Sequence, residues 1–366
     1  MKAINELQKS LSVHLPWHKS RLNCLTRMIL AMIAVRTVNL VDLACAFGGG
    51  KVKALSHYRR LQRFFSSFEI HYSQIASLVF GLFARGEKVY LSMDRTQWQW
   101  GQAPINILML SLVYKGTAIP IYWSMIPHKG NSNTKRRIAL MNRFIKHFGH
   151  GCIAGLLCDR EFVGEEWFRY LKNAEIAFYI CVKNNTVTTN KQGKSVDLWT
   201  QFMGLNYREQ RVLKGRRRIY GIKVHLVGVR CDDGEQLIVA TSEKPVNVIE
   251  TYRLRWEIET LFGCLKSRGF RFEDTHITKP ERINKLVAVL TIAFAWAHRI
   301  GEWRHEEKEP IKIKTHGRLA KSLFRHGLDF VRRLLFFGQF CLKTFRLCLG
   351  PLSTDKSGQP RMVFNF

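Results

Sequence analysis

The chain has 366 residues, of which 46% are hydrophobic and 12% aromatic, so it is long enough for two or three packed domains and is not intrinsically disordered. Its 58 lysines and arginines face 28 acidic residues, and the resulting net charge of +30 indicates a polyanionic partner, most often nucleic acid. A ribosome-associated or membrane-surface protein would share this charge.

The cysteines and apolar runs indicate where such a protein works. The nine cysteines are scattered and include no CxxC pair, which disfavours a zinc site or a disulfide framework and fits a reducing cytoplasm. The first twenty residues lack the apolar core of a signal peptide. The longest apolar run, 286–297, is shorter than the roughly 20 residues of a membrane span. We therefore expect a cytoplasmic protein that does not enter a membrane.

Residues 1–86 are predicted to form a helical N-terminal region that binds DNA. Apolar runs of helical length cover 25–35 and 72–86, and a basic segment lies between them. That segment combines Arg59, Arg60 and Arg63 with aromatic residues, so it could lie against DNA. A solvated charged face with an apolar underside explains the same pattern equally well.

Residues 87–183 alternate between strand and helix patterns. Strands are expected at 88–94, 105–116, 117–126, 152–159 and 176–183, and helices at 131–148 and 165–175. This order predicts an α/β domain whose mixed sheet is covered on both faces. Residues 184–248 then form a β-rich insertion, 249–305 return to helix, and 306–366 are a basic C-terminal region.

The segment 252–266, YRLRWEIETLFGCLK, carries an unusual row of polar residues. On an ideal helix Tyr252, Arg255, Glu259 and Lys266 fall within an arc of about 60°, beside an apolar stripe. An ordinary Arg255–Glu259 pair would be worth only a few tenths of a kcal/mol. Glu257 points to the far side and is expected to tolerate glutamine unless it has a packing or pairing role.

Two aspartates complete the pattern. Asp94 and Asp159 each close an apolar strand, where side chains face the ligand crevice of an open α/β sheet, although either could merely cap a helix or begin a turn. With Glu259 they supply three carboxylates, the ligand set of hard divalent metals. A pair of Mg²⁺ ions held in this way can activate a water or a 3′-hydroxyl at a phosphodiester. DNA would then be the partner of the positive charge.

These residues resemble the DDE-class insertion-sequence transposases, in particular the insertion-sequence family numbered four. The signature of that family is Tyr, two residues, Arg, three residues, Glu, six residues, Lys, and residues 252–266 match it without a gap. The two acidic motifs match at MDRTQW, whose acid is Asp94, and at CDREF, whose acid is Asp159. A signature and two motifs in the correct order are far more specific than any one motif.

The resemblance implies a ribonuclease-H-like catalytic core, with a mixed sheet, interrupted by the β-rich insertion and flanked by helical regions. It implies three catalytic and metal-binding carboxylates: Asp94, Asp159 and Glu259. It also implies three phosphate-binding side chains: Tyr252, Arg255 and Lys266. Two Mg²⁺ ions, replaceable by Mn²⁺, would serve hydrolysis and strand transfer in cut-and-paste transposition at terminal inverted repeats. The protein is expected to act as a homodimer on the nucleoid of a bacterium. Its partners would be the DNA of the terminal inverted repeats and the target DNA.

Two other functions remain open. One is a catalytically inactive, DNA-binding descendant of a transposase, and the other is a different metal-dependent nuclease on the same fold. Intact carboxylates and an intact signature favour the active transposase.

Overall fold

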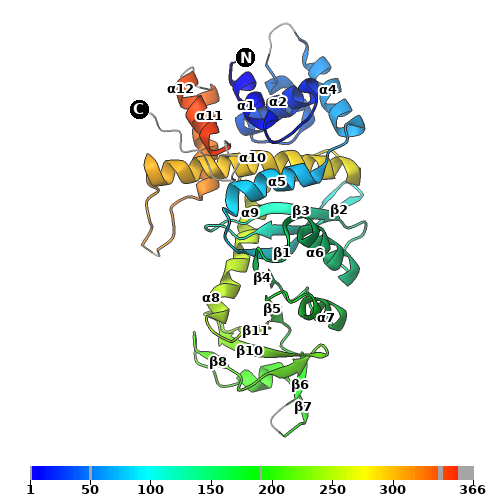
Figure 1. The fold of residues 1–366 in the computed structure, drawn as a ribbon, viewed down its shortest axis with the longest axis vertical. Helices are drawn as coiled ribbons and strands as arrows, with labels where there is room; N and C mark the ends of the chain where they lie inside the picture. The colour runs from blue at the N-terminus through cyan, green and yellow to red at the C-terminus, as the bar shows by residue number, and fades with distance from the viewer. Residues whose placement is uncertain (1, 49–51, 190–191, 316, 337–340, 353–366) are drawn as a thin grey trace.

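The computed structural model describes residues 2–48, 52–189, 192–315, 317–336 and 341–352. The end of the predicted basic C-terminal region, from residue 353, lies outside these residues. In Figure 1 one long helix, α10 (Pro280–Glu307), crosses the molecule, with a group of helices on one side of it and the sheet on the other.

A mixed sheet of nine strands runs through the molecule in the order β3-β2-β1-β4-β5-β11-β10-β8, and β9 pairs with β10 at its side. The strands are β1 (Val89–Trp100), β2 (Ala103–Leu112), β3 (Ile119–Met125), β4 (Ile153–Cys158), β5 (Phe178–Val182), β8 (Gln210–Val212), β9 (Arg217–Ile219), β10 (Ile222–Arg230) and β11 (Gln236–Thr241). Strands β1, β2 and β3 are antiparallel, whereas β4 and β5 run parallel to β1. This topology confirms the predicted α/β class and the ribonuclease-H-like core.

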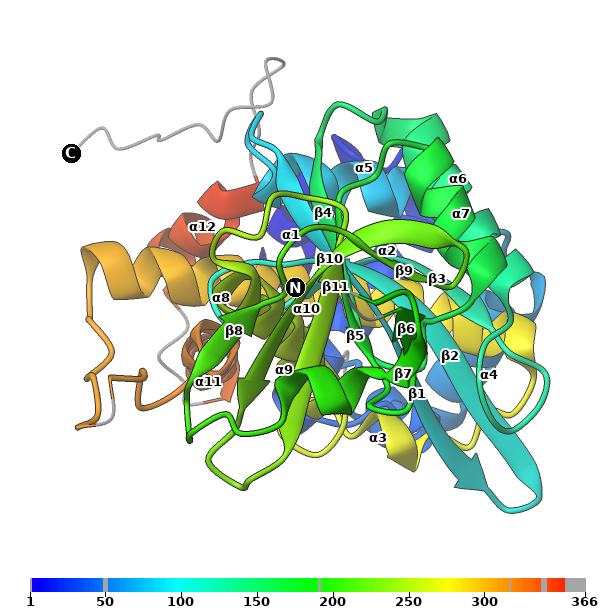
Figure 2. The same ribbon diagram turned by 90° about the horizontal axis from the view of Figure 1, so that it is seen from below.

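The segment 184–248, predicted as a β-rich insertion, is indeed rich in strands. Its strands β11, β10 and β8 continue the core sheet past β5, and β11 pairs antiparallel with β5. The short strands β6 (Val187–Thr189) and β7 (Ser195–Asp197) pair with each other, and η1 (Leu198–Phe202) follows them. Figure 2, seen from below, views the molecule from this end. The segment therefore lengthens the sheet that carries the predicted site.

Helices cover both faces of the sheet, as expected for parallel strands that are apolar along their whole length. All five residues of β5 are buried. Helices α6 (Thr134–Phe148) and α7 (Glu165–Asn173) lie side by side, opposite α8 (Val248–Arg253), in Figures 1 and 2. Asn133 caps α6 by accepting a hydrogen bond from the amide of Arg136. The helix therefore begins at Thr134, within the segment 131–148 that the sequence predicts as helical.

The regions predicted as helical at both ends of the chain pack together on α10. The N-terminal helices are α1 (Lys2–Ser12), α2 (Lys19–Val35), α3 (Leu40–Ala46), α4 (Ala54–Ser67) and α5 (Tyr72–Phe83). The C-terminal elements are α11 (Leu323–Phe336), α12 (Leu342–Leu349) and η4 (Gly350–Leu352). Helix α5 lies between α10 and β3 and so joins this helical layer to the sheet.

Helix α10 is a core helix. By length and hydropathy it could cross a membrane, but 89% of its most apolar window is buried inside the protein. The bent pair α2 and α3 passes the same test only when counted as one span, and it bends by 101°. Every residue of the apolar run 286–297 is buried against neighbouring elements, as predicted for a core helix.

Candidate active site

The two predicted aspartates lie at the end of a parallel strand pair. The pairing of β1 with β4 ends at Met93 and Cys158, and Asp94 and Asp159 are the next residues along each strand. Each carboxylate accepts a 2.7 Å hydrogen bond from the amide of the residue that follows it. The prediction that Asp94 ends its strand is wrong, because β1 continues to Trp100 in a hairpin with β2.

The signature segment contains a break that helical periodicity does not reveal. Instead of one helix, the chain forms α8, a 3₁₀ turn η2 (Leu254–Trp256) and α9 (Glu257–Leu265). Tyr252 near the end of α8 and Arg255 within the 3₁₀ turn are both buried, with the guanidinium carbon 5.7 Å from the centre of the Tyr252 ring.

Arg255 lies between the three predicted catalytic carboxylates. Its Nη2 donates to Oε1 of Glu259 at 2.7 Å, and its Nη1 is 3.6 Å from Oδ2 of Asp94. The residue is 6% exposed, so burial opposes its charge. The phenol of Tyr252 and the carboxylates of Glu259 and Asp159 outweigh burial and raise the pKa of Arg255 above its ordinary value. Two of the acids thus pair with one buried cation, and the charge of the third acts on the same cation.

The pKa of Asp94 is shifted by its surroundings. Its side chain is 17% exposed, and burial raises its pKa from 3.8 to about 6. The neighbouring carboxylates of Asp159 and Glu161 add to this rise, whereas the Arg95 amide and Arg255 oppose it. A carboxylate that is buried and crowded by like charges is typical of a site that accepts a cation or a proton.

The donor set fits a hard divalent cation. Asp94 and Asp159 present carboxylate oxygens side by side, and a cation there would offset the burial that raises the pKa of Asp94. Glu259, whose side chain is 52% exposed, turns to Arg255. Within the described ranges no group of three His, Cys, Asp or Glu side chains is already gathered around one point. Arg255 engages one oxygen of Glu259, Oε1.

The other two residues of the signature lie around this centre in different ways. Tyr252 is 2% exposed, and its hydroxyl interacts with the thiol of Cys181, so burial raises the pKa of Tyr252. Lys266 follows the last residue of α9, and its Nζ is 2.8 Å from Oε1 of Glu273 and 3.3 Å from the carbonyl oxygen of Gln97. Tyr252 thus supports the site from within, and Lys266 is paired at its edge. Their phosphate contacts remain predictions.

Sequence reasoning missed a bridge between the two aspartate motifs. Arg95 Nε donates to both oxygens of Glu161 at 3.2 and 3.1 Å. The amide and hydroxyl of Ser132 donate to the same carboxylate. An Arg directly after Asp94 and a Glu two residues after Asp159 were the available signal. The bridge fixes the two aspartate-bearing segments relative to each other.

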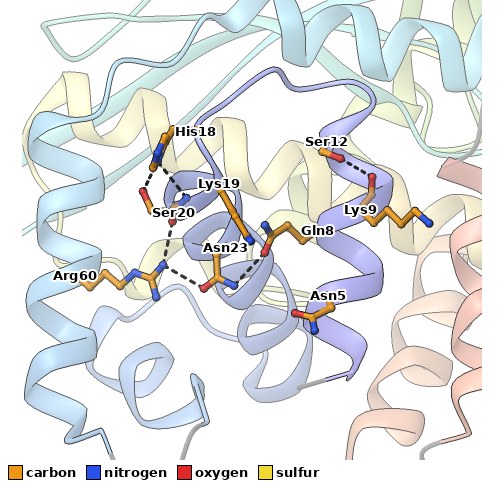
Figure 3. A pocket seen from close by; sticks show the side chains of 9 residues that line it. All are labelled: Asn5, Gln8, Lys9, Ser12, His18, Lys19, Ser20, Asn23 and Arg60. Atoms are coloured by element: carbon orange, nitrogen blue, oxygen red, sulfur yellow. Dashed lines mark hydrogen bonds between the residues drawn. The ribbon is translucent and has the colours of Figure 1, made fainter.

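The basic segment predicted to contact DNA contributes one side chain to a hollow between α1, α2 and α4 (Figure 3). Arg60 donates to the carbonyl oxygen of Ser20 at 3.0 Å and to Oδ1 of Asn23 at 3.2 Å. Asn23 in turn donates to Gln8. Arg59 and Arg63 are exposed on α4. Arg60 therefore holds helices together, and the two other arginines face solvent.

Comparison with known proteins identifies the family to which the chain is similar. A protein-family profile described as "Transposase DDE domain" matches residues 85–296, more than half of the chain. The fold is similar to a piggyBac transposase in a synaptic complex with hairpin DNA, solved by cryo-EM, with 12% identity and a TM-score of 0.47. That similarity covers 99% of this chain and 86% of the other. No curated protein matches the chain.

Proposed function

Because the chain belongs to the transposase DDE-domain family, we propose that it cuts an insertion sequence out at its terminal inverted repeats and joins it to target DNA by strand transfer. The observation that carries this proposal is the arrangement of Asp94, Asp159 and Glu259 around the buried Arg255. Oxygen ligands from two adjacent strands and a helix suit metal-assisted chemistry at a phosphodiester. The net charge of +30 supports DNA as the substrate.

Asp94, Asp159 and Glu259 would hold two Mg²⁺ ions, for which Mn²⁺ can substitute. Such ions, when bound, activate a water or a 3′-hydroxyl and stabilise the leaving oxygen. When Glu259 turns toward the aspartates, Arg255 is released to hold a phosphate. Its guanidinium can grip two oxygens at once, and its buried Nε has no hydrogen-bond partner among the described residues.

The edge of the site supports contacts with the DNA backbone. Lys266 would exchange Glu273 for a phosphate and act there as a point charge. Tyr252 would orient Arg255 from beneath. The unbroken signature spacing supports membership of the insertion-sequence family numbered four. From the same resemblance we also propose that the protein acts as a homodimer at the DNA ends and is located on the nucleoid in the bacterial cytoplasm.

The test is cleavage of DNA that carries the inverted repeats flanking the coding region, with Mg²⁺ or with EDTA. The parent protein is compared with Glu259→Gln and with Glu281→Gln, a matched change at an exposed glutamate on α10. We expect the parent and Glu281→Gln to cut at the repeat ends only with metal. Glu259→Gln should bind the same DNA without cutting it.

Other outcomes point elsewhere. Binding without cutting by the parent would favour an inactive descendant, a reading consistent with the engagement of Glu259 by Arg255. Cutting at sites unrelated to the repeats would favour another metal-dependent nuclease. Equal cutting by Glu259→Gln would remove Glu259 from the catalytic set.

A further inference from the structure

The first residue of α9 makes an unexpected set of contacts. Oε2 of Glu257 accepts a 2.6 Å hydrogen bond from the amide of Tyr114, and its Oε1 accepts one of 2.8 Å from the amide of Gly116. The carbonyl oxygen of Glu257 accepts a third, of 3.0 Å, from the amide of Ala118. Three hydrogen bonds thus tie the start of α9 to the turn between β2 and β3.

The turn is shaped to receive a carboxylate. Lys115 and Gly116 have φ angles of 44° and 89°, and the amide of Thr117 donates to the carbonyl oxygen of Tyr114 at 3.1 Å. These are the features of a turn with two central residues in left-handed conformation. Amides that converge around such residues form an anion-binding concavity. Here the anion is the side chain of Glu257.

The same turn is held from its other side by α10. The hydroxyl of Tyr114 and the Nζ of Lys115 each lie 2.6 Å from Oε1 of Glu302, which is buried. Nζ of Lys115 also reaches Glu306 at 2.7 Å. The turn is therefore held in place by α10, and the carboxylate of Glu257, which the turn binds, is held with it.

The position of this anchor relates it to the site. Strand β2 pairs with β1 with Asp94 opposite Met109, so the turn and Asp94 belong to one rigid ladder. Glu257 and Glu259 are two residues apart on α9, and their side chains therefore leave opposite sides of the helix. One side is bound to the turn and the other to Arg255.

We propose that Glu257 is a positioning residue, whose contacts with the Tyr114–Gly116 turn set the place of α9 and hence of Glu259 relative to Asp94. The assignment rests on the proposed function, because it gives Glu257 a role in the reaction of that site. The expectation that glutamine is tolerated at 257 excepted a packing or pairing role, and the hydrogen bonds of Glu257 are such a role. A glutamine offers one oxygen acceptor, and its amino group would face a backbone N–H.

The contact itself is tested without any reaction. Hydrogen–deuterium exchange at the amides of Tyr114 and Gly116 is compared in the parent, Glu257→Gln and the control Glu281→Gln. We expect exchange at these two amides to become at least about 10-fold faster in Glu257→Gln alone, because their acceptor is weakened. Unchanged exchange would overturn the assignment, whether or not the protein cuts DNA.

The positioning role is tested by separating chemistry from binding. For Glu257→Gln we expect single-turnover cleavage of the repeat ends to slow about 10- to 100-fold, since a misplacement of about 1 Å can cost this much. The Mg²⁺ concentration for half-maximal cleavage should rise, while the Kd for DNA stays within about 3-fold of the parent. Glu257→Asp keeps both acceptor oxygens, so its cleavage rate should lie between those of the parent and Glu257→Gln.

The outcomes separate the two proposals. A parent that binds but never cuts the repeats contradicts the proposed function. A cutting parent with an equally fast Glu257→Gln contradicts the positioning role, and so does a variant whose Kd weakens as much as its rate. If Glu257→Gln does not fold, Glu257→Asp takes its place in both experiments, and parental rates and exchange in that variant would overturn the assignment.

Discussion

At the scale of single residues, Arg255 makes the acidic site possible in the absence of metal. It pairs with Glu259 and Asp94 directly, and the charge of Asp159 helps to raise the pKa of Arg255. Removing this buried cation leaves Asp94, whose side chain is 17% exposed, as an unpaired and poorly solvated charge, which is more costly than the loss of the pair itself. The stability of the metal-free protein should therefore depend on this side chain.

We expect Arg255→Ala to lower the free energy of unfolding by about 3 kcal/mol at pH 8 without metal. The exposed neighbour in Arg253→Ala should cost no more than about 0.5 kcal/mol. Urea unfolding followed with and without Mg²⁺ checks this, and Mg²⁺ should recover part of the loss only in Arg255→Ala. Equal losses in the two variants would contradict the role of Arg255.

A second residue predicts how stability depends on pH. His298 is fully buried between Phe83, Tyr114 and Phe294, and burial lowers its pKa from 6.5 to about 4. The nearby charges act in both directions, because Glu302 raises this pKa whereas Arg299 and Lys115 lower it. The neutral ring is therefore the form that the fold stabilises.

A lowered pKa means that the stabilisation is complete above pH 6.5 and is lost as the pH falls toward 4. The loss from this residue amounts to about 3 kcal/mol. We expect His298→Leu to remove that part of the pH dependence, and His150→Gln, at an exposed histidine, to leave it unchanged. Thermal unfolding between pH 4 and 8 checks the prediction. A parental pH slope in His298→Leu would contradict it.

At the scale of elements, local patterns predicted part of the arrangement that the structure shows around the candidate site. Asp159 was found because an apolar strand ends immediately before it, and the parallel pairing places Asp94 beside it. The polar row on residues 252–266 correctly brought Arg255 to Glu259. These features depend on periodicity and on strand order, which a sequence carries.

What the sequence could not predict depends on partners far along the chain. The carboxylate of Glu257 binds backbone amides of a turn some 140 residues earlier, and backbone groups leave no residue-type signal. The 3₁₀ turn at Leu254–Trp256 is invisible to helical periodicity for a similar reason, since burial of Tyr252 and Arg255 against the sheet selects it. Likewise, the hairpin with β2 extends β1 past Asp94.

The crossing of α10 and α11 gives a prediction at this scale. A Cβ added at Gly301 would lie 1.8 Å from the carbonyl oxygen of Leu323, and one at Gly327 would lie 1.9 Å from that of Ala297. The helices could accommodate either methyl group only by moving apart.

We expect Gly301→Ala and Gly327→Ala each to lower the free energy of unfolding by about 2–3 kcal/mol. Gly81→Ala is the control, because a Cβ there has no atom within 4 Å, and helix propensity should make it stabilising by up to about 1 kcal/mol. Denaturant titration measures all three. A neutral Gly301→Ala would mean that the two helices do not approach each other so closely.

At the scale of the whole molecule, α10 joins two layers with different tasks. The sheet and α9 carry the acids, whereas the helical layer on the other side of α10 carries the basic segment on α4 (Figure 1). The three arginines of that segment differ in their contacts. Arg60 is committed to Ser20 and Asn23, so only Arg59 and Arg63 are left for a phosphate backbone.

The salt dependence of DNA binding decides between a DNA-contacting α4 and a merely solvated face. Each phosphate contact contributes about 0.9 to the slope of log K against log salt concentration. If α4 touches DNA, the double variant Arg59→Ala/Arg63→Ala should lower that slope by about 2 and weaken binding at low salt.

The control Arg169→Ala/Arg208→Ala removes the same amount of charge from residues that already pair with Glu165 and Asp232. Its slope should stay close to the parental value. Equal slopes in the parent and the α4 variant would assign α4 a solvated face. An effect of net charge alone would lower the slope in both variants. A reduced slope confined to the α4 variant would show that Arg59 and Arg63 contact the bound DNA.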